Sequence, residues 1–182
     1  FLDRYLFDPL ARALAPRAMA AMIDPAWLRA GAVGFLILSI LTLLAGWRWT
    51  GLALAMFSGP VDTLGRHLAA LTMRLRRDQR SWMRWREGAA SAVLLALGWN
   101  LREFGWGTVA IAAATLASLG ALHEHERWIG RPSQRPPWLA EPDSLIWLLA
   151  PFALLGWWPV GLAAQAGLAF ASLLKVQRLT GR

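Results

Sequence analysis

The sequence has no cysteine and little acidic charge, with 11 Asp and Glu residues against 19 Lys and Arg residues. The lack of cysteine excludes disulfide bonds, zinc–thiolate sites and a cysteine nucleophile. Lysine is almost absent as well, because Lys175 is the only one, so arginine carries nearly all of the net charge of +8. In a soluble protein, a charge this basic would be typical of nucleic-acid binding.

Hydrophobic residues are abundant instead, at 57% of the 182 residues and with 12 Trp, a composition atypical of soluble domains. The arginines cluster between apolar stretches, which favours membrane anchoring and contact with anionic lipid headgroups over nucleic acid. The length allows a single membrane domain over residues 1–182. Because the chain begins at Phe1 rather than at methionine, we expect it to have been trimmed or excised from something longer.

Six apolar stretches follow one another along the chain, at 30–46, 51–73, 83–101, 106–122, 143–158 and 160–174. A membrane-spanning helix needs about 20 residues, and the last two stretches are short. The segment Gly156-Trp157-Trp158-Pro159 between them is typical of a tight interfacial turn, which supports them as a pair. The pattern predicts an all-α integral membrane protein with a six-helix bundle over 30–174. The core helices of a soluble protein are the alternative.

The basic residues fall almost entirely on one side of these spans. With the N-terminus inside, 16 of the 19 lie on the cytoplasmic side, and only Arg48 and Arg102 lie outside. The positive-inside rule then places both termini and the loops 74–86 and 123–144 in the cytoplasm. We therefore expect an integral protein of the inner (cytoplasmic) membrane.

The N-terminal segment 1–17 has the pattern of an amphipathic helix. Charged residues lie largely off one face, and the apolar residues that share that face are Leu2, Tyr5, Leu6, Leu10, Ala13 and Leu14. This pattern is typical of an interfacial helix lying along the inner leaflet. An ordinary helix packed on other protein is the alternative.

Charged residues inside the predicted spans mark the candidate site, since a charge in a membrane helix is costly unless it faces water or a partner. Asp62 and Arg66 are four residues apart in the second span, so they share a helix face and can pair. His67 follows them, and Glu87 opens the third span. We expect a cavity facing the cytoplasm and lined by both signs of charge. The alternative is an Asp62–Arg66 pair that only allows both residues to be buried.

The basic loop beside this cavity provides further candidates for ligand binding. We interpret Arg74, Asp78 and Arg80 as residues at the cavity mouth. Arginine side chains there could bind a lipid phosphate or a nucleotide pyrophosphate. The alternative is that the loop arginines serve only to determine topology.

Around these residues the sequence resembles the CDP-alcohol phosphatidyltransferase family, whose signature is D-x-x-D-G-x-x-A-R-x8-G-x3-D-x3-D. Residues 2–9 look like the interfacial helix of that family, 46–54 like its outer hairpin and 58–62 like the lead-in to the signature. The resemblance implies a six-span enzyme that transfers a phospho-alcohol or phosphatidyl group from a CDP-linked donor. In the family, four aspartates bind two divalent ions, and the last aspartate deprotonates the acceptor hydroxyl.

Placing Asp62 on the first aspartate of this signature leaves most of the motif unmatched. Only Asp62 and Ala69 match, and Glu87 replaces the fourth aspartate. The remaining positions carry Gly65, Arg66, Ala70, Gln79 and Met83. Because two divalent ions need several carboxylates, the metal chemistry looks lost and we expect no cofactor. In an active enzyme, Asp62 and Glu87 would be catalytic, Asp62, Asp78 and Glu87 would be the residual metal ligands, and magnesium would be the cofactor.

Our leading hypothesis is a non-catalytic, CDP-alcohol phosphatidyltransferase-like membrane protein of phospholipid-type metabolism. Its partners would be membrane lipids, a CDP-linked donor or an anionic headgroup, and either a second copy of the chain or an enzyme. Small residues four apart suit close helix packing, within the chain or in a homodimer, at Ala163, Gly167 and Ala171 and at Ala110, Ala114 and Ser118. An active divergent transferase and a purely structural membrane subunit are the alternatives.

Overall fold

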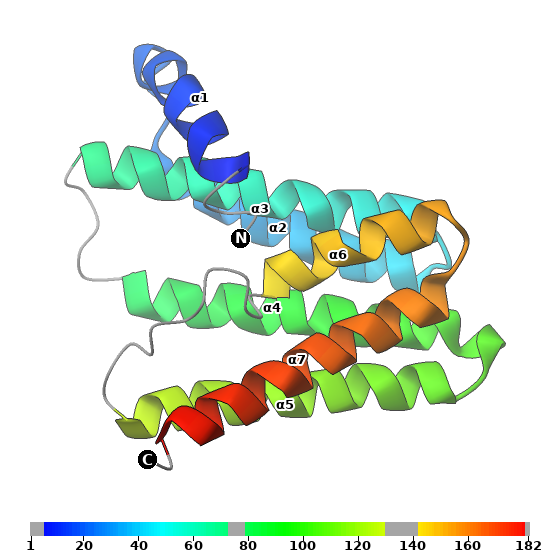
Figure 1. Cartoon of the computed structure of the whole chain (residues 1–182). Coiled ribbons are helices and arrows are strands. Elements are labelled where there is room, and N and C mark those ends of the chain that lie inside the picture. The colour runs from blue at the N-terminus through cyan, green and yellow to red at the C-terminus, as the bar shows by residue number, and fades with distance from the viewer. Residues whose placement is uncertain (1–5, 73–78, 130–141, 181–182) are drawn as a thin grey trace. The chain divides into compact units, whose positions relative to one another are not determined.

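The computed structural model describes residues 6–72, 79–129 and 142–180 (Figure 1). Over these ranges the chain forms seven α-helices, one short 3-10 helix (η2) and no strand, which confirms the all-α fold class. The helices are α1 (Asp8–Ala20), α2 (Pro25–Leu44), α3 (Arg48–Leu71), α4 (Gln79–Asn100), η2 (Leu101–Phe104), α5 (Gly107–Ile129), α6 (Pro142–Leu154) and α7 (Trp158–Thr180).

The contacts divide the chain into two compact units, Phe1–Val93 and Leu94–Arg182. The first unit contains α1, α2, α3 and the first part of α4, and the second contains the end of α4 and the remaining helices. Helix α4 crosses the boundary between the two units. The single domain over 1–182 stays a prediction.

The helices extend beyond the predicted spans at several ends. Helix α2 begins at Pro25, where Asp24 is the N-cap and its side chain accepts a hydrogen bond from the Ala26 amide at 2.8 Å. Helix α4 begins at Gln79, so part of the predicted loop 74–86 is helical, and α5 continues through Ile129 into the predicted loop 123–144. Arginine and glutamate are good helix formers, so the end of an apolar stretch does not mark the end of a helix.

Two helices within the described residues are long and apolar enough to cross a membrane, Pro25–Leu44 and Trp158–Arg178. Shorter apolar helical segments lie at Gly107–Leu122 and Ser144–Leu154. Helix α3 has the length of a span, at 24 residues, but carries the charged residues Arg48, Asp62 and Arg66. Six spans are therefore a prediction that goes beyond these two helices.

In the first unit, α2 packs along α3 through a face that repeats every three or four residues. The buried residues on this face of α2 are Pro25, Arg29, Ala32, Leu36, Ser39 and Leu43. The hydroxyl of Ser39 donates a hydrogen bond to the Gly51 carbonyl at 2.7 Å. A Cβ atom on Gly51 would lie 2.5 Å from Cγ of Leu43, so the two backbones need a glycine there. This packing brings Arg29 into the interior, against α3.

Helix α1 packs on α3 through small residues rather than through its leucines. Its buried residues are Ala11, Ala15 and Ala18, of which the last two contact Leu68. Leu6 and Leu10, on the predicted apolar face, are each 46% exposed. The helix therefore has one face on protein, as in the alternative interpretation, and a separate leucine face for the membrane surface that we predict.

In the second unit, α7 packs against α5 and α6. The side chain of Gln165 is fully buried and donates a hydrogen bond to the Leu145 carbonyl of α6 at 2.6 Å. Leu122 and Val176 form a small apolar cluster between α5 and α7. The predicted small-residue stripes lie mostly on exposed positions, since Ser118 is half-buried and the others, Ala110, Ala114, Ala163, Gly167 and Ala171, are exposed.

The α2–α3 and α6–α7 hairpins use the same turn, although they belong to different units. Gly46 and Gly156 follow the first helix of each pair with φ values of 94° and 74°, which favour glycine. The next residue, Trp47 or Trp157, donates its amide back to the first helix. Five residues after each turn glycine, Gly51 and Gly161 lie where a Cβ atom would contact the first helix within 3 Å. Both turns therefore hold two helices in close antiparallel contact.

Candidate anion-binding site

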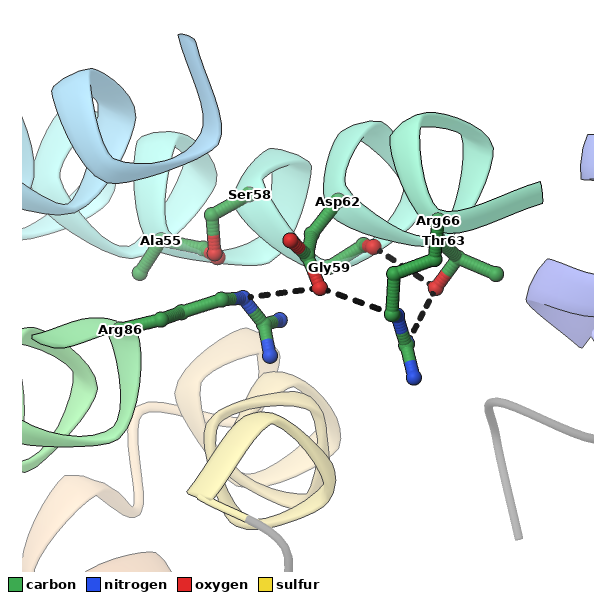
Figure 2. A network of polar contacts seen from close by, with 7 residues as sticks. All are labelled: Ala55, Ser58, Gly59, Asp62, Thr63, Arg66 and Arg86. Atoms are coloured by element: carbon green, nitrogen blue, oxygen red, sulfur yellow. Dashed lines mark hydrogen bonds and ion pairs between the residues drawn. The ribbon is translucent and has the colours of Figure 1, made fainter. Parts of the chain in front are cut away.

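Asp62 lies at the centre of a buried polar network in the first unit (Figure 2). The buried residues of α3 recur at three- and four-residue spacing, and Asp62 occupies one of these positions with 2% of its surface exposed. Its Oδ2 atom lies 3.1 Å from Nε of Arg66 and 3.3 Å from Nε of Arg86. Its Oδ1 atom is buried and has no hydrogen-bond partner among the described residues. One carboxylate oxygen thus serves two guanidinium groups.

Arg66 is held in place by its own helix. Its Nη2 atom donates a hydrogen bond to the Thr63 hydroxyl at 3.0 Å, and that hydroxyl donates to the Gly59 carbonyl at 3.0 Å (Figure 2). The side chain of Arg66 is 32% exposed, whereas that of Arg86 is 14% exposed. Arg66 therefore forms the outer part of the network, and Arg86 on α4 lies deeper.

Arg29 of α2 adds a third guanidinium group to this region. It is only 5% exposed and interacts electrostatically with Asp62, Arg66 and Arg86. Its Cζ atom lies over the Trp82 ring at 5.5 Å from the centroid, which is cation–π contact distance. Gly65 makes room for it, because a Cβ atom there would lie 2.8 Å from Cγ of Arg29. We call Arg29, Asp62, Arg66 and Arg86 the arginine cluster.

Several buried donors of the cluster and of Trp82 beside it have no acceptor in the described part of the chain. These are Nε and Nη2 of Arg29 and Nε1 of Trp82. A buried donor without a partner costs about 1–3 kcal/mol, and more when it is charged. Asp62 forms ion pairs with Arg66 and Arg86, and Arg29 adds a further buried positive charge that interacts with it electrostatically. Charge and orphaned donors both point to an anion as the missing component.

Only some of the predicted site residues lie in the part of the chain that the structure describes. The predicted Asp62–Arg66 pair is confirmed by their ion pair. His67 and Glu87 are half-buried on α3 and α4, next along the chain to the Asp62 partners Arg66 and Arg86. Arg80 lies on α4 but its side chain is outside the described residues, and Arg74 and Asp78 lie outside them altogether. The roles assigned to these five residues stay predictions.

Sequence reasoning missed Arg29 and Arg86 as site residues. Arg29 falls before the apolar stretch and was assigned to the basic N-terminal segment, but the cap at Asp24 starts α2 one turn earlier. The charge pattern places Arg86 in a loop, but it lies on α4 four residues after Trp82 and so on the same helix face. The Asp24-Pro25 capping motif is the feature that could have placed Arg29 inside a helix.

The donor set does not fit the magnesium pair that the family resemblance implies. No group of three or more His, Asp or Glu side chains in the described residues is close enough to hold a metal ion. Magnesium takes about six oxygen ligands in a near-octahedral shell. Here Arg66 and Arg86 contact the Asp62 carboxylate and Arg29 interacts with it electrostatically, and the charge of these guanidinium groups would repel a cation.

Comparison of the chain with protein-family models, with curated proteins and with solved structures gives no match. The case for this site therefore rests on the chain's own residues and their geometry.

Proposed function

We propose that the chain is a non-catalytic integral membrane protein that binds the phosphate of an anionic lipid headgroup or of a CDP-linked nucleotide at the arginine cluster. It has six spans, with both termini on the cytoplasmic side of the inner membrane, and acts as a homodimer or as the membrane partner of an enzyme. One observation carries this proposal. Arg29 is only 5% exposed, and its Nε and Nη2 donors have no acceptor among the described residues.

The surface of α2 supports the membrane location. Its outward face is apolar, with Ile37, Leu38, Leu41 and Leu44 each at least 50% exposed. Its inward face holds Arg29 and Ser39, which are 5% and 0% exposed. The outward face of a helix in a soluble protein is usually polar, whereas lipid surrounds an apolar outward face at no cost. Exposed tryptophans at helix ends, Trp47, Trp49, Trp106 and Trp157, suit the headgroup region.

Electrostatics support an anionic ligand. Guanidinium groups bind phosphate oxygens through paired, charge-assisted hydrogen bonds, which are stronger than neutral ones. Arg66 is partly exposed, so a phosphate can reach the cluster from its side. Asp62 holds Arg66 and Arg86 in position before any ligand arrives, which reduces the entropy that binding would otherwise lose.

The same geometry argues against phosphatidyltransferase chemistry. In the family that the chain resembles, paired metal ions hold the pyrophosphate of the donor. Here Arg66 and Arg86 both contact Oδ2 of Asp62, so a metal ion on this carboxylate would lie beside two guanidinium groups. The arginines supply the positive charge instead, so binding persists while group transfer is lost.

A binding and turnover assay tests this proposal. The purified chain in phosphatidylcholine nanodiscs would be titrated with CDP and with phosphatidylglycerol, and CMP release would be followed with magnesium, a CDP-linked lipid and acceptor alcohols. We expect binding of a phosphate ligand that Arg66→Gln weakens by about 10-fold, without CMP release. The exposed Arg102, which lies in the second unit, provides the control Arg102→Gln with unchanged binding.

Two results would overturn the proposal. CMP release that disappears in Asp62→Ala would establish an active transferase. Absence of binding to any phosphate ligand would leave a structural subunit whose charged groups only pair with one another.

A further inference from the structure

We infer that Arg29 and Trp82 make the cluster selective for a terminal phosphate, a monoester, over a phosphodiester. This inference rests on the proposed function, because it specifies which phosphate the same site accepts. The relevant ligands are a lipid with a terminal phosphate headgroup or a small soluble phosphate monoester, and both present the same group.

The charge of the cluster favours the monoester. A phosphate monoester carries about −1.5 to −2 charges near pH 7, whereas a diester carries a single charge. The guanidinium groups of Arg29, Arg66 and Arg86 lie in one largely buried region of the first unit. Their positive charge attracts the more highly charged monoester more strongly than the diester.

The orphaned donors on Arg29 suit two oxygens of one phosphate group. The Nε–H and Nη2–H bonds lie parallel on the same edge of the guanidinium plane, and both nitrogens are buried and unpartnered. This edge is the one that arginine uses for bidentate binding of phosphate. Arg29 thus retains a complete two-donor edge that neither Asp62 nor any other described residue uses.

Trp82 contributes in two ways. Its ring lies against the Arg29 guanidinium group, at 5.5 Å from the ring centroid to Cζ, which restricts the orientation of that group. Its Nε1–H is a further buried donor with no acceptor among the described residues. A monoester has three terminal oxygens for these donors, whereas a diester has two, and its second ester group would have to enter the space around buried side chains.

Matched ligand pairs test the selectivity. The chain in phosphatidylcholine nanodiscs would be titrated with phosphatidic acid and phosphatidylglycerol, and the chain in detergent with methyl phosphate and dimethyl phosphate. We expect the monoester of at least one pair to bind about 10-fold more tightly than the diester. Preference in the lipid pair alone identifies a headgroup as the ligand, and preference in both pairs identifies any phosphate monoester.

Three variants assign the selectivity to residues. Arg29→Gln should bring monoester and diester affinities within about 2-fold, and Trp82→Phe, which keeps the ring but removes the donor, should weaken the monoester alone by about 5-fold. Arg102→Gln is the matched control, because Arg102 also stacks on a tryptophan, Trp99 at 4.4 Å, but is exposed and lies in the second unit. Thermal unfolding without ligand confirms that each variant folds.

The outcomes separate this inference from the proposed function. Equal affinities of monoester and diester in the wild type overturn the inference while the proposed function stands. A preference that survives in both Arg29→Gln and Trp82→Phe also overturns it. Failure of every phosphate ligand to bind overturns the proposed function itself.

Discussion

Arg86 on α4 places its Nε atom 3.3 Å from Oδ2 of Asp62 on α3, although the two residues are far apart along the chain. The same oxygen accepts Arg66 from its own helix at 3.1 Å. Asp62 therefore joins a local ion pair to a long-range one. Because its side chain is only 3% exposed, this junction lies away from bulk water.

Asp62→Asn tests the role of this junction in folding. The variant removes the buried carboxylate that pairs with Arg66 and Arg86, so we expect a loss of about 3 kcal/mol in the free energy of unfolding. Phosphate should restore part of the loss, because an anion can take the place of the carboxylate. Unfolding in detergent would be measured in phosphate and in chloride at equal ionic strength. An equal response to both salts would argue against an anion site.

Arg29→Met distinguishes a binding residue from a structural one. Removal of a buried charged group with unpartnered donors should raise the free energy of unfolding by about 1–2 kcal/mol in the absence of phosphate. The same variant should lose the stabilisation that phosphate gives the wild type. Unfolding curves with and without phosphate provide both quantities. A large destabilisation without ligand would mean that Arg29 serves the fold instead.

Gly65→Ala tests the space that α3 leaves for Arg29. The added Cβ would lie 2.8 Å from Cγ of Arg29 and 3.4 Å from its backbone nitrogen. We expect a loss of about 1–3 kcal/mol in unfolding free energy, together with weaker phosphate binding. Gly34→Ala on α2 is the matched control, since no atom lies within 4 Å of its Cβ position. Equal effects of the two substitutions would contradict the close packing at Gly65.

The absence of cysteine allows a direct test of topology, because each introduced cysteine is the only thiol in the chain. Glu103 is exposed in η2, on the predicted outer side, and Arg178 is exposed near the end of α7, on the predicted inner side. In intact cells, a membrane-impermeant maleimide should label Glu103→Cys and should leave Arg178→Cys unlabelled until the cells are opened. The opposite pattern would reverse the orientation, and labelling of both would argue against membrane burial.

The amino-acid pattern is sufficient to predict the all-α fold class and one contact of the site, the Asp62–Arg66 pair. Apolar stretches bounded by charged residues predicted helices throughout, and the four-residue spacing of Asp62 and Arg66 predicted their pair, because both features depend on local geometry. Hydropathy, in contrast, describes composition and not partners. A hydropathy average counts Asp62 and Arg66 as charges although they pair with each other. Helix α3 is therefore not among the helices apolar enough to cross a membrane, while Asp62 is paired with Arg66 and Arg86 inside the first unit.

Arg29 and Arg86 could not be placed from the pattern for a physical reason. Their positions depend on how α2 and α4 approach α3, and that approach is determined by Gly51, Gly65 and the aromatic contact at Trp82. None of these contacts is encoded in the residues adjacent to the arginines. The face of α1 was mistaken for a similar reason, because alanines that pack closely on a neighbouring helix are weaker markers of burial than leucines.

A structure determined with tungstate, a heavy-atom analogue of phosphate, tests the central claim most directly. We expect one anomalous peak within hydrogen-bond distance of Nε and Nη2 of Arg29 and close to Arg66. Two bridged magnesium ions at Asp62, or an empty cluster in which protein atoms accept the Arg29 donors, would contradict the account.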